Sequence, residues 1–204
     1  MAETLTQIRV GPEDHGRRMS FEDFQRAEPV DGHLYELARG VVEVSDVPGK
    51  IHALILDIFE IAIGAYRAAH PGVIRYSAAG SGAKVELPGI ESERHPDRSI
   101  YLTPMPDDDD PWDKWVPSIV IEIVSPGAEA HERDFRTKRD EYLAAGVLEY
   151  VIVDPQTRAV LDLTRHGDRW REQWIREHGE WRPALLPGFS LKLDELFAVL
   201  DRPS

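Results

Sequence analysis

The chain contains no cysteine. A disulfide framework, a zinc–thiolate centre, an iron–sulfur cluster and a thiol nucleophile are therefore excluded, and the composition is consistent with the reducing cytoplasm. Any metal must bind through oxygen or imidazole ligands. The chain also lacks a long uninterrupted hydrophobic run, because charged residues break its longest apolar stretch, 51–69. We therefore expect neither a transmembrane segment nor a secretory signal.

Basic residues are scarce relative to acidic ones. Lys and Arg number 24 against 37 Asp and Glu, which gives a formal net charge of −13 at pH 7. Lys and Arg supply most non-specific affinity for nucleic acid by neutralising phosphates, so bulk charge does not favour such binding here. A nucleic-acid site would have to be local. The 204 residues, 42% of them hydrophobic, suffice for one domain with a sizeable core.

The order of apolar patterns predicts an α/β fold with a mixed sheet. We expect residues 1–18 to be a flexible leader and 19–200 to form a single domain. An i, i+3, i+4, i+7 spacing predicts a long amphipathic helix over 51–69. The other predicted elements are a short helix over 20–27, a hairpin within 33–44, strands near 73–87, 98–102, 118–124 and 147–153, a helix over 131–145, an exposed Pro- and Asp-rich loop over 104–117, and C-terminal strands followed by a helix over 193–200.

Glu122 interrupts a strand that is otherwise apolar on both faces, 118–124. An ionised carboxylate there costs several kcal/mol in desolvation unless a cation or hydrogen-bond donors compensate it. Two interpretations stand level on the strand alone: a buried salt bridge to Lys or Arg from a packed helix, and a metal-ligand role.

Asp97 follows a proline at the start of a predicted strand, 98–102. Neighbouring strands would place Asp97 and Glu122 at one edge of the sheet, and two carboxylates joined by waters commonly hold Mg²⁺. A metal held in this way can activate water and stabilise phosphoryl transfer. Taken alone, Asp97 is better explained as a turn or cap residue.

Three further residues are weaker candidates. Lys138 flanks the apolar stripe of the helix 131–145, where it could reach an anionic site or lie along the core with its ammonium in water. Glu36 is an exposed hairpin residue or a third acid of the site. His52 begins the long helix and is more often a surface or capping histidine than a ligand.

Charged and aromatic residues elsewhere leave further alternatives. Arg133, Arg136 and Arg139 could contact phosphates, but interspersed acids favour solvated ion pairs. The three tryptophans within 170–181 could belong to the core or to an interface. The four consecutive aspartates at 107–110 do not converge as a metal cage and are interpreted as solvated charge.

Several motifs in order resemble the Uma-two (Uma2) family of restriction endonucleases, within the PD-(D/E)XK nuclease superfamily. The resemblance covers nearly everything after residue 18. Its pieces are Met19-Ser-Phe-Glu-Asp-Phe24, Tyr35-Glu36-Leu37 with Gly40, His52, Pro96-Asp97, Ile121-Glu122-Ile123-Val124-Ser125-Pro126, Lys138, Tyr142-Leu-Ala-Ala-Gly-Val147, Glu149-Tyr150-Val-Ile-Val-Asp-Pro155 and Leu186-Pro-Gly-Phe-Ser190.

The resemblance implies a restriction-endonuclease-like core of helix, three strands, helix and strand. It also implies that Asp97 and Glu122 bind the metal, that Lys138 is the site's lysine, moved from the strand to the helix, and that Glu36 joins the site. His52 would be a neighbour. The sequence departs from the superfamily motif because Val124 stands where the motif has lysine, so activity would depend on Lys138 reaching Glu122.

We therefore expect an endonuclease that hydrolyses DNA phosphodiester bonds with Mg²⁺, or alternatively Mn²⁺, and that acts as a homodimer. Two alternatives stay open: a catalytically inactive nuclease fold that serves as a binding module, and a metal-dependent phosphodiesterase acting on RNA or a small substrate. Fold alone does not decide among them.

Overall fold

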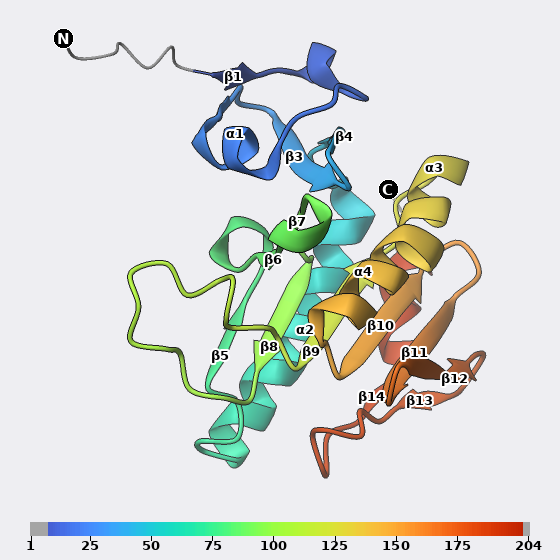
Figure 1. Cartoon of the computed structure of the whole chain (residues 1–204). Coiled ribbons are helices and arrows are strands. Elements are labelled where there is room, and N and C mark those ends of the chain that lie inside the picture. The colour runs from blue at the N-terminus through green and yellow to red at the C-terminus, as the bar shows by residue number, and fades with distance from the viewer. Residues whose placement is uncertain (1–7, 202–204) are drawn as a thin grey trace, which may run out of the picture. The chain divides into compact units, whose positions relative to one another are not determined.

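The structure is a computed structural model that describes residues 8–201 (Figure 1). Contacts divide the described chain into two compact units: a smaller unit of 8–47 with 86–94, and a larger unit of 48–85 with 95–201. The leader expected over 1–18 lies partly outside the described residues. Within its described part, β1 (Arg9–Val10) pairs in parallel with β2 (Glu28–Pro29), and the side chain of Val10 is buried.

The smaller unit contains the predicted short helix and hairpin. Helix α1 (Phe21–Arg26) begins after Ser20, whose Oγ accepts a hydrogen bond from the Asp23 N–H at 3.1 Å. The hairpin strands β3 (His33–Ala38) and β4 (Val41–Asp46) turn at Arg39 and Gly40, both with positive φ. A four-stranded sheet has the order β4-β3-β7-β6, with β6 at Val85–Leu87 and β7 at Ser92–Arg94.

The larger unit is built on a six-stranded sheet of order β12-β11-β10-β9-β8-β5. Strands β9 and β10 are parallel, and the other neighbours are antiparallel. The strands are β5 (Tyr76–Ala78), β8 (Arg98–Tyr101), β9 (Ile119–Ile123), β10 (Glu149–Asp154), β11 (Ala159–His166) and β12 (Arg169–Ile175). A two-stranded sheet adds β13 (Glu180–Trp181) and β14 (Leu191–Lys192).

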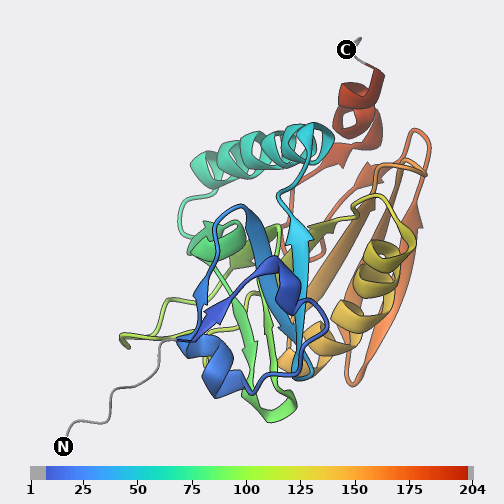
Figure 2. The same cartoon turned by 90° about the horizontal axis from the view of Figure 1, so that it is seen from above.

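Helices cover both faces of this sheet, as Figure 2 shows for α2 on one side and the run from α3 to α4 on the other. Helix α2 (Lys50–Ala69) packs through its apolar stripe with α5 (Leu193–Phe197) on the β9 isoleucines at 119, 121 and 123. Alternation turns the intervening Glu122 toward the opposite face. That face is covered by α3 (Ala128–Glu132), one π-helical turn (Arg133–Thr137) and α4 (Lys138–Ala145).

The long helix, the buried strand over 118–124 and the mixed α/β architecture match the sequence predictions. The prediction of core strands near 73–87 is partly wrong. Only Tyr76–Ala78 pairs with β8, whereas Val85–Leu87 belongs to the four-stranded sheet. A 3₁₀ turn at Gly80–Gly82 separates the two segments, and apolar patterning cannot reveal such a change of partner.

The loop over 104–117 is exposed along its aspartates, but it folds back through aromatic residues. Trp115 is buried, with its ring centroid 4.0 Å from that of Tyr101, and its Nε1 donates to Thr103 Oγ1 at 3.1 Å. Among residues 8–201, no helix is long and apolar enough to cross a membrane.

Candidate active site

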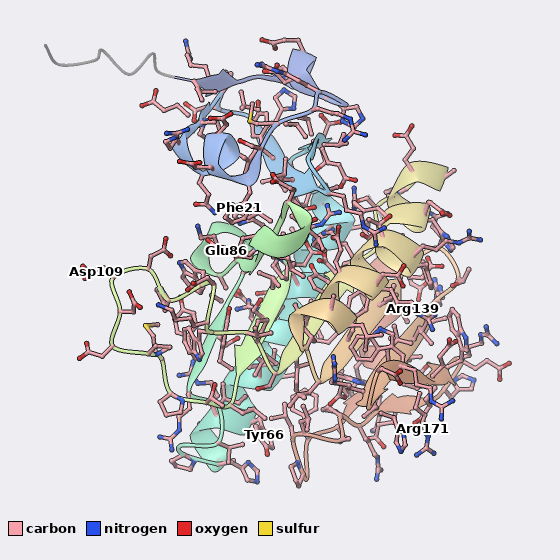
Figure 3. All side chains as sticks on the ribbon, viewed as in Figure 1. Phe21, Tyr66, Glu86, Asp109, Arg139 and Arg171 are labelled. Carbon is pink, nitrogen blue, oxygen red and sulfur yellow. The ribbon has the colours of Figure 1, made fainter. Side chains whose placement is uncertain are left out.

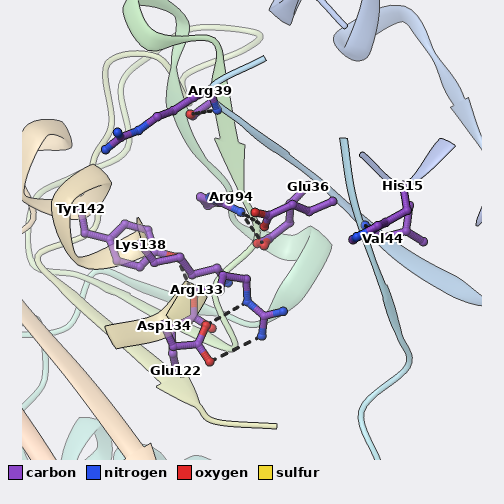
Figure 4. Close-up of polar contacts among 12 residues, drawn as sticks. His15, Glu36, Arg39, Val44, Arg94, Glu122, Arg133, Asp134, Lys138 and Tyr142 are labelled. Carbon is purple, nitrogen blue, oxygen red and sulfur yellow. Dashed lines mark hydrogen bonds and ion pairs between the residues drawn. The ribbon is translucent and has the colours of Figure 1, made fainter. Parts of the chain in front are cut away.

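Glu122 lies in the middle of a buried polar cluster between β9 and α4. Its exposed fraction is 3%, and its Oε1 accepts hydrogen bonds from Lys138 Nζ at 2.9 Å and from the Tyr142 hydroxyl at 2.6 Å. Figure 4 shows both side chains directed from the helix toward Glu122. The buried salt bridge expected from a packed helix is therefore present, and its cation is Lys138.

The helix presents both donors because Lys138 and Tyr142 are four residues apart and share one face. Lys138 is itself only 3% exposed, so its ammonium is held at the carboxylate and does not extend into water. A single π-helical turn, Arg133–Thr137, precedes it and sets the register of α4. Lys138 thus reaches Glu122, which is the contact on which the sequence analysis made activity depend.

Asp97 lies immediately before β8 and joins the cluster through the backbone of β9. Its Oδ2 accepts a hydrogen bond from the Ile123 N–H at 2.7 Å, which places Asp97 beside the residue that follows Glu122 on β9. His52 Nε2, from the first turn of α2, lies 3.0 Å from Asp97 Oδ1. Both His52 ring nitrogens are buried and make no hydrogen bond with other described residues. The His52 side chain is 11% exposed, so it is not the surface histidine that its position alone favoured, and its role in the site stays a prediction.

Asp134 is a buried acid that the sequence analysis took for part of a solvated ion-pair network. It is 1% exposed and accepts from Arg133 Nε at 3.0 Å, while the Tyr150 hydroxyl donates to its backbone carbonyl at 2.8 Å. Burial raises the pKa of the Asp134 carboxyl, and the charges of Lys138 and Arg133 oppose that rise. Its spacing of one turn before Lys138 was the only sequence signal for this position.

Glu36 lies on β3 in the smaller unit, where its partner is a buried arginine. Arg94 Nη1 lies 3.2 Å from Glu36 Oε2 and 2.5 Å from Glu43 Oε2, and the Arg94 side chain is fully buried. The carboxylate of Glu36 is therefore held in an ion-pair network, which differs from a freely solvated hairpin residue. Its membership of the site stays a prediction.

The donor chemistry of Asp97 and Glu122 suits a hard divalent cation. Within residues 8–201, no group of three or more His, Asp or Glu could by itself hold a metal ion. Mg²⁺ does not need such a cage, because it is usually held by one or two carboxylates together with water and substrate phosphate. Asp97, which lies at Ile123, and the adjacent Glu122 could supply the one or two carboxylates that Mg²⁺ needs.

A second buried acid cluster lies on the opposite face of the same sheet. Glu149 on β10 accepts from the N–H groups of Ala184 and Leu185, each at 3.3 Å, and Asp162 on β11 accepts from Trp181 Nε1 at 3.2 Å. Burial and the neighbouring Asp162 raise the pKa of Glu149 to about 8, and burial raises that of Asp162 to about 6. At neutral pH the pair therefore retains one proton.

Comparisons with known proteins bear on the fold and the family of this chain. A crystal structure described as "a putative nuclease belonging to DUF820" from Anabaena variabilis superposes with a TM-score of 0.70 at 15% identity, over 89% of this chain and 99% of that one. At this identity the likeness shows a shared fold. No curated protein matches the chain. The model of the Uma2 family, described as "Putative restriction endonuclease", matches residues 21–194, and the chain belongs to this family.

Proposed function

We propose that the protein is a Mg²⁺-dependent endonuclease that hydrolyses phosphodiester bonds of DNA. The observation that carries the proposal is the position of Asp97 beside Ile123, next to Glu122 on β9, with Lys138 paired to Glu122. Two acids that hold a metal beside a lysine can serve the hydrolysis of a phosphodiester. Mn²⁺ could serve in place of Mg²⁺, because it accepts the same oxygen ligands.

In this reaction a water oxygen bonds to phosphorus, the bond from phosphorus to one sugar oxygen breaks, and that oxygen takes a proton. Asp97 and Glu122 would hold the metal, which supplies positive charge for the phosphoryl oxygens. Lys138 and Tyr142 keep Glu122 ionised and fixed in place through their two hydrogen bonds. His52 Nε2 lies 3.0 Å from Asp97 Oδ1, so the imidazole would help to position that carboxylate.

Glu36 is proposed to complete the site, as the resemblance implies, and its role is open to a direct test. Replacement by Gln keeps the shape of the side chain and removes its charge. A role in metal binding predicts a higher Mg²⁺ concentration at half-maximal cleavage, whereas a role confined to the Arg94 pair predicts a loss of stability alone. Cutting both strands would need two such sites, as a homodimer supplies.

The test is cleavage of supercoiled plasmid, single-stranded DNA and RNA with Mg²⁺, Mn²⁺ or EDTA. We expect metal-dependent nicking of DNA by the wild type and a fall of about 10³-fold in Asp97→Asn and Glu122→Gln, since several kcal/mol of transition-state stabilisation are lost. Asp109→Asn is the matched control, because Asp109 extends into solvent from the loop (Figure 3) and is exposed.

Each alternative has its own outcome. Cleavage that survives in both site variants would contradict the proposed site. A folded wild type that binds no Mg²⁺ in a calorimetric titration and cuts no substrate would indicate the inactive binding module. Cleavage of RNA or a small diester, with DNA left intact, would indicate the other phosphodiesterase.

A further inference from the structure

Four flat side chains form a continuous stack on the surface of the larger unit. The rings of His131 and Phe135 stack with centroids 4.1 Å apart, and those of Phe135 and Trp174 stack at 6.0 Å, each pair with an interplanar angle of 16°. The Arg176 guanidinium carbon lies 4.6 Å from the centre of the Trp174 ring. We call these four residues the aromatic stack.

Trp174 is more exposed to solvent than Trp170 and Trp181, the other two tryptophans of this region. Trp181 is buried in the core, and Trp170 is half-buried with its Nε1 bonded to the Arg139 carbonyl at 3.0 Å. Trp174 remains 42% exposed on β12, the edge strand of the six-stranded sheet. Trp174 lies inside the stack between Phe135 and Arg176, so the flat surfaces left to a ligand are those of its end members, the His131 imidazole and the Arg176 guanidinium.

The register of the sheet connects the aromatic stack to the active site. Trp174 is opposite Leu161, Leu161 is opposite Ile152, and Ile152 is opposite Glu122. Residues in one such row project from the same face, so Trp174 and Glu122 lie on the same side of the sheet. Three strand spacings separate their backbones by about 14 Å. The buried Leu161 and Ile152 lie between them, so a nucleotide strand would reach the active site around the run from α3 to α4.

Charge is concentrated around the stack with a sign opposite to that of the whole chain. The two segments that carry the stack hold six arginines in a chain of net charge −13, namely Arg133, Arg136 and Arg139 on one and Arg169, Arg171 and Arg176 on the other. Arg139 on α4 and Arg171 on β12 are labelled in Figure 3. Arg136, 76% exposed, pairs with Glu132 at 3.4 Å, and Arg139 pairs with Glu172 at 2.5 Å. Surface ion pairs of this kind contribute little energy, so either arginine can exchange its carboxylate for a phosphate.

We propose that the aromatic stack is a binding surface for an unpaired stretch of nucleic acid leading to the active site. A base extends the stack, and the surrounding arginines contact the phosphates. The inference rests on the proposed function for its ligand class and adds a preference for strands with unpaired bases. Base stacking is sequence-tolerant, so it predicts no strong sequence preference at this surface.

The test is fluorescence anisotropy in EDTA, so that binding is measured without cleavage. The probes are a fluorescein-labelled oligothymidylate about twelve nucleotides long, an abasic strand of equal length and charge, and a matched duplex. We expect Trp174→Leu to weaken oligothymidylate binding about tenfold and to leave abasic binding unchanged. Arg176→Gln should weaken both strands and reduce the salt dependence.

Trp112→Leu makes the same substitution in the acidic loop beside Tyr101, near the opposite edge of the sheet, and should leave both affinities unchanged. Thermal melts of all variants show whether each is folded. Equal wild-type affinity for the abasic and thymidylate strands, or no effect of Trp174→Leu in a folded protein, would overturn the inference. So would a dimer of the wild type that Trp174→Leu converts to a monomer with unchanged oligonucleotide affinity, because β12 would then be an interface between copies.

These outcomes are separable from those of the proposed function. Metal-dependent cleavage together with an inert Trp174→Leu substitution would reject the binding surface and retain the nuclease. Stacking-dependent binding by a wild type that cuts nothing would retain the surface and reject the nuclease.

Discussion

The two faces of the six-stranded sheet each bury carboxyl groups, but they compensate them differently. On the α4 face, Glu122 receives a lysine ammonium and a tyrosine hydroxyl. On the α2 face, Glu149 and Asp162 have backbone N–H groups and the indole of Trp181 as their donors. Burial raises the pKa of both acids on the α2 face, whose donors are neutral groups, whereas the lysine ammonium on the α4 face favours the ionised form of Glu122.

The acids on the two faces also differ in their position along the strands. Glu122 lies near the end of β9, where Asp97 leads toward solvent with 17% of its side chain exposed. Glu149 begins β10 and is closed off by the segment around Ala184. An ionised acid close to solvent, such as Asp97, can bind a cation. The Glu149–Asp162 pair, which retains a proton inside the core, instead connects the sheet to the C-terminal segment.

Removal of the cation should produce the largest change. In Lys138→Met the Glu122 carboxylate would remain buried without its counter-ion, and we expect the free energy of unfolding to fall by about 3–5 kcal/mol. Urea denaturation measures this loss. Adding Glu122→Gln to Lys138→Met should recover part of it, because no charge then remains to be compensated. An equally unstable double variant would contradict this account.

Loss of the Tyr142 hydroxyl should have a smaller effect on the same cluster. Tyr142→Phe removes one hydrogen bond to a charged acceptor while preserving the ring that packs edge-on against Tyr150. We expect a loss of about 2 kcal/mol in the free energy of unfolding. The matched control is Tyr66→Phe, whose hydroxyl donates to the neutral Pro187 carbonyl and should matter less. If Tyr66→Phe lowered the free energy of unfolding as much as Tyr142→Phe does, the charge of the Glu122 acceptor would not explain the effect.

The acid pair on the other face should make stability depend on pH. The folded-state pKa of Glu149, about 8, and that of Asp162, about 6, lie above their ordinary values. The folded protein therefore binds more protons than the unfolded chain, so this stabilisation is complete in acid and is lost as the pH rises toward 8. The slope can approach about 1.4 kcal/mol per pH unit for each proton.

Urea denaturation of Glu149→Gln across the same pH range isolates that contribution. Gln keeps an oxygen acceptor for the Ala184 and Leu185 N–H groups but cannot titrate. We expect a flatter profile between pH 5 and pH 8 than in the wild type. An unchanged slope would show that other groups cause the pH dependence.

Local patterns sufficed for the elements that hold the site. An acid inside the apolar run at 118–124 predicted a buried partner, and the register of the helix at 131–145 brought Lys138 forward as a candidate. Both follow from burial and periodicity, which are properties of neighbouring residues. Tyr142 was identified as part of the apolar stripe, but its hydrogen bond to Glu122 was not foreseen, because a tyrosine's polar tip has no pattern of its own.

Long-range pairing accounts for most of what the sequence did not reveal. Glu149 and Asp162 come together because β10 and β11 pair in one register, and their donors come from residues 181–185. Val85–Leu87 likewise lies in the four-stranded sheet and not in the predicted core sheet, because it pairs with a different strand. Such choices depend on contacts between residues far apart in the chain, which an apolar pattern does not encode.

The π-helical turn at Arg133–Thr137 also lets this chain hold one additional residue before Lys138 without rotating the rest of the helix. A π turn contains one more residue than an α-helical turn, and deleting one residue within 133–137 would allow the helix to run straight. The side chains after the deletion would keep nearly the same direction around the helix axis, because the π turn holds its extra residue within one turn. The same deletion in the α-helical part before Lys138 would instead rotate Lys138 and Tyr142 by about 100° away from Glu122.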